Sequence, residues 1–228
     1  MENAGLSQQR VSIVKVKPEF VVAIDGPAGA GKSTAAQGVA AALEGFRYLD
    51  TGAMYRAVTA YLLRFDKKDA SENEMAEAAE GLELRAGKHF VHGVDVSDAL
   101  RTPGVDAEVS RVSALPRVRR VIQGKQREQR GRIVVEGRDI GSVVFPNAAV
   151  KVFLTAQLSE RARRRHRQDP VQSPDEVQAS IARRDAIDSS RADSPLIVPE
   201  GAHEIDTTEL SIEEMVERIV SLVQAADA

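Results

Sequence analysis

One stretch of the chain has the residue types and spacing of a phosphate-binding loop. Residues 26–33 read G-P-A-G-A-G-K-S and match the pattern G-x-x-x-x-G-K-[ST] at every fixed position. Glycines allow successive backbone N–H groups to curl around a phosphate, and a helix that begins beside them adds partial positive charge. The lysine of this pattern reaches the β- and γ-phosphates of a nucleotide, and the hydroxyl of the serine or threonine that follows it binds Mg²⁺. We therefore predict that this loop binds the phosphates of a nucleotide and that Ser33 is the metal ligand. The predicted phosphate-binding residues are Gly26, Pro27, Ala28, Gly29, Ala30, Gly31, Lys32, Ser33 and Thr34.

A second block of polar residues, T-G-A-M-Y-R at 51–56, follows a short apolar run. Thr51 has the residue type that caps helices, and Tyr55 and Arg56 fall one turn further along the predicted helix. At that spacing a hydroxyl, a phenol and a guanidinium can meet one ligand. A capped helix with a core tyrosine and a solvated arginine fits the same residues, so this block alone leaves both interpretations open.

A third block, E-G-R-D-I-G at 136–141, follows the apolar run 133–135. The carboxyl ends of parallel strands meet at one edge of a sheet, so we expect this block beside the phosphate-binding loop. Glu136 is placed to hold the water shell of a metal ion, and Arg138 and Asp139 offer a donor fork and an acceptor. A structural ion pair in a turn is the alternative.

Arginine is concentrated around these blocks, at Arg117, Arg119, Arg120, Arg161, Arg164, Arg165, Arg183, Arg184 and Arg191. Most basic runs are solvated helix faces. Phosphoryl transfer gives a stronger reason, because charge spreads over the transferred group and must be neutralised. RNA binding through 161–167 is a third interpretation, but a formal net charge of −3 and an aromatic content of 4% argue against a nucleic-acid partner.

The elements that must position these residues alternate between strand and helix. Helical patterns, beginning with the alanine-rich segment 32–43, separate the strand candidates. Those candidates are short apolar runs at 20–24, 48–49, 133–135, 150–154 and, weakly, around 205. The alternation predicts an α/β fold with a parallel five-stranded sheet and helices on both faces.

Other segments add to that pattern. Acidic residues crowd 66–83, and strand-like alternation broken by glycines follows, which predicts an inserted helix and a small antiparallel sheet. The basic run 160–167 and a capping box at 173–176 predict a helical hairpin. A second capping box at 211–214 opens a final helix with a predicted apolar face of Ile212, Met215, Val216, Ile219 and Val223.

Composition narrows the class of protein. The 228-residue chain contains no cysteine, which excludes a disulfide scaffold, a thiolate zinc site and a thiol enzyme, and suits a reducing cytoplasm. No apolar run approaches the roughly 20 residues of a membrane-spanning helix, and residues 1–18 read as an arm rather than a secretory signal. The N-K-x-D, D-x-x-G and L-S-G-G-Q motifs of GTPases and transporter ATPases are missing. We expect a cytoplasmic protein with no membrane partner.

In this order the blocks resemble the bacterial cytidylate kinases, which are P-loop nucleoside monophosphate kinases for CMP and dCMP. The resemblance covers nearly the whole chain from Phe20 onward. It includes L-D-T-G-A-M-Y-R, L-P-R-V-R, E-G-R-D-I-G-S-V-V-F-P-N-A, K-V-F-L-T-A, S-E-R-A-R-R-R and R-R-D-A-I-D-S-S-R. The resemblance implies a P-loop NTPase-type fold and a monomer that uses Mg²⁺ and transfers the γ-phosphoryl group of ATP to CMP or dCMP.

The resemblance also implies roles for individual residues. Residues matching Thr51, Arg138 and Asp139 read the cytosine edge. Those matching Arg56 and Arg119 hold the CMP phosphate, and those matching Arg184 and Asp188 contact its sugar. The full set around CMP is Thr51, Tyr55, Arg56, Arg119, Arg138, Asp139, Arg184 and Asp188. The catalytic set is Lys32, Arg138, Arg161 and Arg165, in which Arg161 and Arg165 belong to a lid that reaches the ATP phosphates.

The same resemblance divides the chain into parts. The core comprises 19–69, 106–158 and 173–228, a small α/β monophosphate-binding insertion occupies 70–105, and a helical lid occupies 159–172. Two alternatives stay open at this point. One is a P-loop kinase for another monophosphate or small metabolite, and the other is a nucleotide-binding regulator without transfer. Formation of ADP that depends on an added acceptor distinguishes a kinase from a regulator.

Overall fold

The structure is a computed structural model that describes residues 19–168 and 173–228. The predicted arm at 1–18 and the end of the predicted lid, 169–172, lie outside the described residues. The described helices are α1 (Lys32–Ala42), α2 (Thr51–Arg64), α3 (Glu72–Glu80), α4 (Pro103–Ala114), α5 (Pro116–Arg127), α6 (Leu158–Gln168), α7 (Pro174–Ser190) and α8 (Ile212–Asp227), with the short turns η1 (Ser97–Ala99) and η2 (Ile140–Val144).

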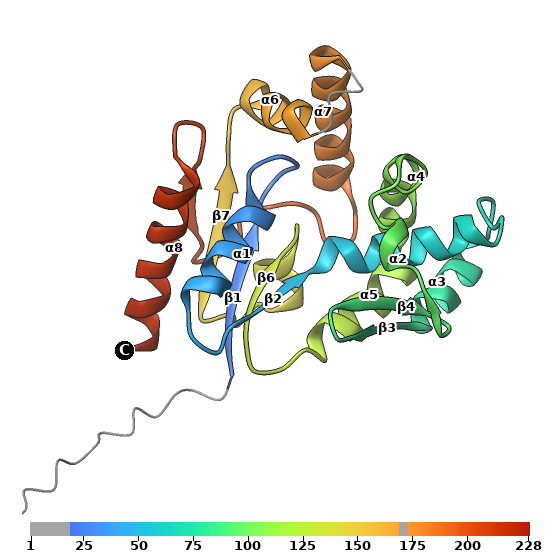
Figure 1. Cartoon of the computed structure of the whole chain (residues 1–228), viewed down its shortest axis with the longest axis horizontal. Coiled ribbons are helices and arrows are strands. Elements are labelled where there is room, and N and C mark those ends of the chain that lie inside the picture. Colours follow the sequence, from blue (N-terminus) through green and yellow to red (C-terminus); the bar gives the residue numbers. More distant parts are fainter. Residues whose placement is uncertain (1–18, 169–172) are drawn as a thin grey trace, which may run out of the picture.

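Five parallel strands form the larger sheet, in the order β2-β6-β1-β7-β8 (Figure 1). They are β1 (Phe20–Asp25), β2 (Arg47–Asp50), β6 (Arg132–Glu136), β7 (Val150–Thr155) and β8 (His203–Asp206). Each includes a run from which the sequence predicts a strand, so the predicted five-stranded parallel sheet is confirmed. The order places β1 in the centre, and the loop that follows β1 therefore opens in the middle of the carboxyl edge.

The central strand is apolar from Phe20 to Ile24 because both of its faces are covered. Val22 and Ile24 pack into a core with residues of α1 and α8. Ala23, between them, packs on the opposite side with Ile133 and with Ile140 of η2. A strand buried on both faces has no need of alternating polar residues, which explains the continuous run at 20–24.

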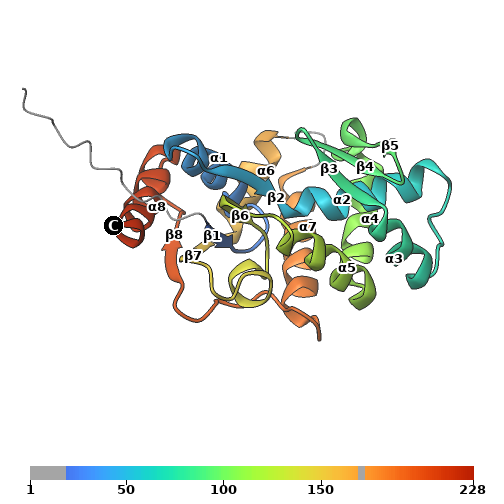
Figure 2. The ribbon, with the colours of Figure 1, turned by 90° about the horizontal axis from the view of Figure 1, so that it is seen from below.

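The predicted insertion forms the expected helix and antiparallel sheet, made of α3 and of β3 (Leu82–Arg85), β4 (Lys88–Val91) and β5 (Val94–Asp95). These elements lie beside the parallel sheet (Figure 2). Their apolar core also contains Met54 and Val58 of α2, Val109 of α4 and Ile122 of α5. The packed unit is therefore larger than the inserted segment, since α2, α5 and the part of α4 beyond residue 105 supply part of its core.

Local signals at the helix ends are mostly confirmed. The capping boxes at Ser173 and Ser211 both form and open α7 and α8. The apolar face of α8 is buried at Met215, Ile219 and Val223, but the prediction is wrong at Ile212, which is 55% exposed. Ile212 stands in the first turn of α8, where it lines the cavity described below instead of packing on the sheet. No helix within 19–168 or 173–228 is long and apolar enough to cross a membrane.

Candidate active site

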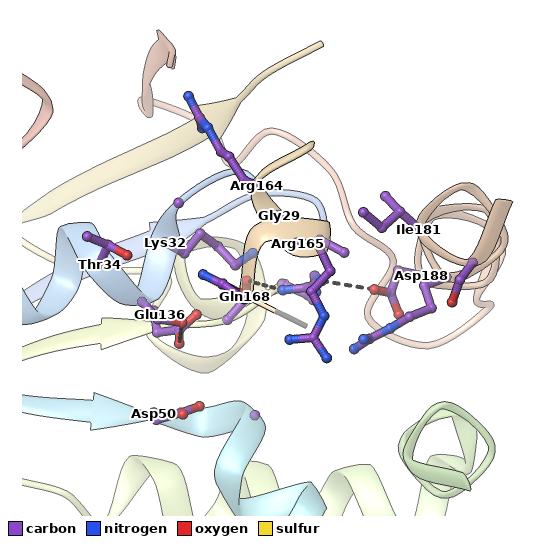
Figure 3. A pocket seen from close by; sticks show the side chains of 18 of the residues that line it. Gly29, Lys32, Thr34, Asp50, Glu136, Arg164, Arg165, Gln168, Ile181 and Asp188 are labelled. Atoms are coloured by element: carbon purple, nitrogen blue, oxygen red, sulfur yellow. Dashed lines mark hydrogen bonds and ion pairs between the residues drawn. The ribbon is translucent and has the colours of Figure 1, made fainter. Parts of the chain in front are cut away.

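The carboxyl ends of the central strands open into a cavity of about 980 Å³. Lys32, Asp50 and Glu136 lie on its sheet side, and Asp188 of α7 lies across from them (Figure 3). Most of the predicted site residues line this cavity: Ala28, Gly29, Gly31, Lys32, Ser33, Thr34, Thr51, Tyr55, Arg56, Arg119, Arg138, Asp139, Arg165, Arg184 and Asp188. Gly26, Pro27, Ala30 and Arg161 do not line it.

The phosphate-binding loop depends on glycine at its first position. Gly26 has φ 148°, and a Cβ there would lie 2.1 Å from the carbonyl oxygen of Leu154 in β7. No side chain fits that approach, so only glycine lets the chain leave β1 along this path. The far side of the loop is held by Asp185 of α7, which accepts a hydrogen bond from the Ala28 N–H at 3.0 Å.

Lys32 is the buried cation of the site. Its side chain is 5% exposed, and its Nζ donates to the Pro27 carbonyl at 2.7 Å. Burial is the main cause that lowers the pKa of Lys32 to about 7, and Arg138 lowers it further, against the opposing effect of Glu136. Near neutral pH the amine therefore holds its proton weakly until an anion enters the cavity.

Binding of ATP should therefore take up protons. Triphosphate oxygens beside Lys32 favour its charged form, so its pKa rises on binding and a proton enters from solvent. The uptake should be a fraction of a proton at pH 7 and larger at pH 8, where the unliganded amine is mostly neutral. Calorimetry of MgATP binding in buffers with different ionisation enthalpies measures it. Uptake that is the same in Lys32→Met would contradict this assignment.

A hydroxyl and a carboxylate meet beside Lys32. The Ser33 hydroxyl donates to Glu136 Oε1 at 2.6 Å, and the Tyr48 hydroxyl donates to the same oxygen at 3.2 Å. Burial, followed by Glu136, raises the pKa of Tyr48, which keeps this phenol a donor. Mg²⁺ prefers such oxygen ligands and is commonly held by one or two of them together with waters and substrate phosphates. The donors present therefore fit this ion.

A buried ion pair forms another part of the cavity wall. Arg119 of α5 donates to Asp139 Oδ2 at 2.7 Å, and their side chains are only 2% and 8% exposed. Gln123 donates to the same oxygen at 2.9 Å. The Arg119 guanidinium lies 5.6 Å from the ring of Tyr55, whose buried hydroxyl has no hydrogen-bond partner among the described residues. The wall therefore offers a free phenol hydroxyl next to a fixed carboxylate.

Further arginines approach from α2, from α6 and from the turn that follows β6. Arg56 of α2 pairs with Asp106 of α4 at 2.6 Å, and Arg165 of α6 reaches the other oxygen of that carboxylate at 3.3 Å. Arg138 pairs with Asp188 at 2.9 Å.

Arg184 is different, because no ion pair holds it within the described part of the chain. Burial, Arg138 and Arg56 lower its pKa, while Asp188 and Asp106 oppose them. The cavity thus contains more cations than paired carboxylates can balance, which favours an anionic ligand.

Comparison with known protein families decides which class of protein has this site. Residues 22–225 match the family described as cytidylate kinase. The chain belongs to the cytidylate kinase family. The cytidylate kinase of Solibacter usitatus is 47% identical over 215 residues, which are 90% of this chain and 92% of that protein. The cytidylate kinases of Caldanaerobacter subterraneus and Mycobacterium leprae are 46% and 45% identical, over 89% and 90% of this chain and 94% and 96% of their own.

One solved structure that aligns with this cytidylate kinase family member is more distant in sequence. A gluconokinase from Sinorhizobium meliloti aligns with 92% of this chain and 94% of its own, at 16% identity and with a TM-score of 0.44.

Two residues of this family member lie differently from their predictions. Thr51 is not the cap of α2. Asp50 is, because its carboxylate accepts the Ala53 N–H at 2.9 Å, while the Thr51 hydroxyl donates to the Glu136 carbonyl at 2.7 Å. Arg161 faces away from the cavity, since its guanidinium donates to the carbonyl of Ala28 and pairs with Asp185. Its geometry braces the back of the phosphate-binding loop.

Several residues that line the cavity, or that hold a residue lining it, carry no role in the sequence prediction. They are Asp106, which holds two arginines, Gln123, which holds Asp139, and Arg191, which pairs with Asp188 at 3.2 Å. Arg191 stands out in the sequence as one of the concentrated arginines. Asp106 and Gln123 carry no such signal, because their partners are far away along the chain.

The basic run of α6 is largely paired with other residues of the chain. Arg163 and Arg164 both bind Glu160, and Arg164 also donates to Thr207. Arg164 is held by both of these partners, whereas the Arg163 side chain remains 56% exposed.

Proposed function

We propose that this cytidylate kinase family member transfers the γ-phosphoryl group of ATP to CMP or dCMP, giving ADP and CDP or dCDP. The observation that carries the proposal is the composition of one cavity. Residues of the phosphate-binding loop line it together with Arg56, Arg119, Arg138 and Asp139. A donor and an acceptor nucleotide bound there would face each other directly.

The chemistry of this step needs few protein groups. An oxygen of the CMP phosphate attacks the γ-phosphorus, the bond to the β–γ bridging oxygen breaks, and its electron pair leaves with ADP. A phosphate monoester loses its second proton near pH 6, so the attacking oxygen is already ionised and needs no general base. We propose that Lys32 and Arg165 neutralise the charge that spreads over the transferred group.

Mg²⁺ would complete the donor site. We propose that Ser33 binds the ion directly and that Glu136 holds it through water, consistent with the 2.6 Å contact between their oxygens. Held by these two residues, the ion would supply positive charge that offsets the negative charge of the phosphate oxygens.

Recognition of cytosine would rest on Asp139 and Arg138. Cytosine presents an amino donor where uracil presents a carbonyl. Asp139 Oδ2 already accepts from Arg119 and Gln123, which leaves Oδ1 as the acceptor for that amino group. A uracil carbonyl would face the same carboxylate without a hydrogen bond, so we expect UMP to be a poor acceptor. We further propose that Arg56 and Arg119 hold the CMP phosphate, and Arg184 and Asp188 its sugar.

The division of the chain also remains a proposal. We propose that the insertion 70–105 and the lid 159–172 close over both nucleotides, so that water does not replace CMP as the acceptor. We also propose a monomer located in the cytoplasm, where its nucleotide substrates are found.

Release of ADP tests this function directly. The assay contains ATP and Mg²⁺ with CMP, dCMP, UMP, AMP, GMP or no acceptor. We expect fast turnover with CMP and dCMP, slow turnover with the others, and far slower ADP release without an acceptor. Equal turnover with another monophosphate would overturn the assignment of Arg138 and Asp139. Fast ADP release without an acceptor would overturn closure against water.

A further inference from the structure

Asp25 is a buried carboxylate to which neither the motif nor the proposed reaction gives a role. It is the last residue of β1, its side chain is completely buried, and it directly precedes Gly26 of the phosphate-binding loop. A buried carboxylate is costly unless hydrogen bonds compensate it, so its partners indicate what it does.

The partners of Asp25 are two backbone groups of the turn that follows Asp139. The Ile140 N–H donates to Asp25 Oδ1 at 2.8 Å, and the Gly141 N–H donates to Oδ2 at 2.7 Å. Both carboxylate oxygens are therefore used to fix two consecutive residues. A Cβ at Gly141 would lie 3.0 Å from the Pro199 side chain and 3.3 Å from Asp25 Oδ2, so the turn packs closely on both.

This turn carries the proposed acceptor-reading residues. Arg138 and Asp139 immediately precede Ile140, and the Asp139 carbonyl accepts the N–H groups of Val143 and Val144 at 2.9 and 3.0 Å. The Asp139 side chain is held from its other side by Arg119 and Gln123. The backbone that bears the two side chains is thus anchored at Asp25, and their position depends on that anchor.

We infer that Asp25 is a positioning residue for the acceptor nucleotide, which ties the turn of Arg138 and Asp139 to the strand that carries the phosphate-binding loop. The inference rests on the proposed function, because CMP is the acceptor that this turn would read. Asp25 does not line the cavity and holds the turn of Arg138 and Asp139, so its effect should appear in acceptor affinity more than in ATP affinity.

Asp25→Asn is the decisive variant. An amide has one acceptor oxygen, so one of the two turn N–H groups loses its partner and faces an NH₂ group. We expect the Kd and KM of CMP to rise between about tenfold and a hundredfold. The Kd of MgATP should change less than about threefold. An unchanged KM for CMP, or equal losses for both nucleotides, would overturn the inference.

A matched control separates positioning from stability. Asp227→Asn makes the same chemical change in α8, where Asp227 pairs with Arg132, outside the cavity. It should lower the melting temperature and leave the Kd of CMP unchanged. Wild-type turnover with CMP is measured first. If the wild-type protein does not phosphorylate CMP, the proposed function fails. If it does, and Asp25→Asn has the same Kd and KM for CMP as the wild type, only the inference about Asp25 fails.

The anchor should also respond to pH. Burial is the main cause that raises the pKa of Asp25 to about 6, Asp139 raises it further, and Lys32 and the two N–H donors lower it. Protonation of Asp25 removes one acceptor, so the turn should loosen below about pH 6. CMP loses its second phosphate proton in the same range, but that effect cancels in the ratio of the Kd of Asp25→Asn to that of wild type. The ratio should fall toward one below pH 6, and a constant ratio would contradict the anchor.

A wild-type measurement keeps the test independent of the variant's folding. In a pH titration by NMR, the Asp25 side-chain carboxyl carbon and the amides of Ile140 and Gly141 should shift with one common midpoint. Amides that stay fixed while the Asp25 carboxyl titrates would show that the carboxylate does not hold the turn.

Discussion

Replacing Lys32 by methionine should lower kcat for CMP phosphorylation about a thousandfold, the upper range for removing one preorganised donor from a transition state. Lys32 is buried beside the loop that would hold the ATP phosphates, so solvent cannot replace its charge. Steady-state assays at saturating ATP measure the loss. Lys151→Met, which removes a lysine of β7 outside the cavity, should keep full activity.

The Lys32→Met variant should fold at least as stably as the wild type at pH 6. The folded pKa of Lys32, about 7, lies below its ordinary value of 10.5, so folding opposes its protonation. Below pH 7 Lys32 carries its proton in both the folded and the unfolded protein, so folding bears the whole cost of burying the charge. This cost falls as the pH rises from 7 to 10.5, because the folded protein then loses the proton first. Methionine never carries this charge. A variant that is inactive because it is unfolded would contradict the account, and thermal unfolding distinguishes the two.

Replacing Arg119 by methionine should damage both stability and acceptor use. It leaves Asp139 as a buried carboxylate without its cation, at a cost of about 3–5 kcal/mol in the free energy of unfolding. It also removes a proposed ligand of the CMP phosphate, so kcat/KM for CMP should fall by about a thousandfold or more. Urea unfolding and steady-state kinetics measure the two effects.

The double variant Arg119→Met with Asp139→Asn separates those effects. Neutralising both partners removes the stranded charge, so much of the lost stability should return. Turnover of CMP should not return, because both proposed nucleotide contacts are absent. Recovery of activity together with stability would show that Arg119 and Asp139 serve only the fold.

Much of the fold could be predicted because its signals are local. The strand at β1, the loop at 26–34 and the capping boxes at Ser173 and Ser211 each depend on residues a few positions apart. The prediction is wrong for the cap of α2, where Asp50 takes the place expected of Thr51. Asp50 and Thr51 are adjacent and both are good capping residues, so only the backbone path at the end of β2 selects Asp50.

The partners of the arginines could not be predicted, because they depend on long-range packing. Arg119 pairs with Asp139 and Arg161 with Asp185, across 20 and 24 residues of sequence. Nothing near Arg161 in the sequence indicates that it braces the phosphate-binding loop from behind. The same limit hides Asp25, whose partners Ile140 and Gly141 lie more than a hundred residues away. A sequence pattern identifies which residues could serve the site, and the fold decides which of them reach it.

Phosphorus NMR of one reaction mixture shows whether the γ-phosphoryl group passes from ATP to CMP. Wild-type protein is added to equimolar ATP and CMP with Mg²⁺, and all phosphorus signals are followed together. We expect ADP and CDP to appear in equal amounts as ATP and CMP disappear, with almost no inorganic phosphate. Loss of ATP to ADP and inorganic phosphate, with CMP unchanged, would contradict it.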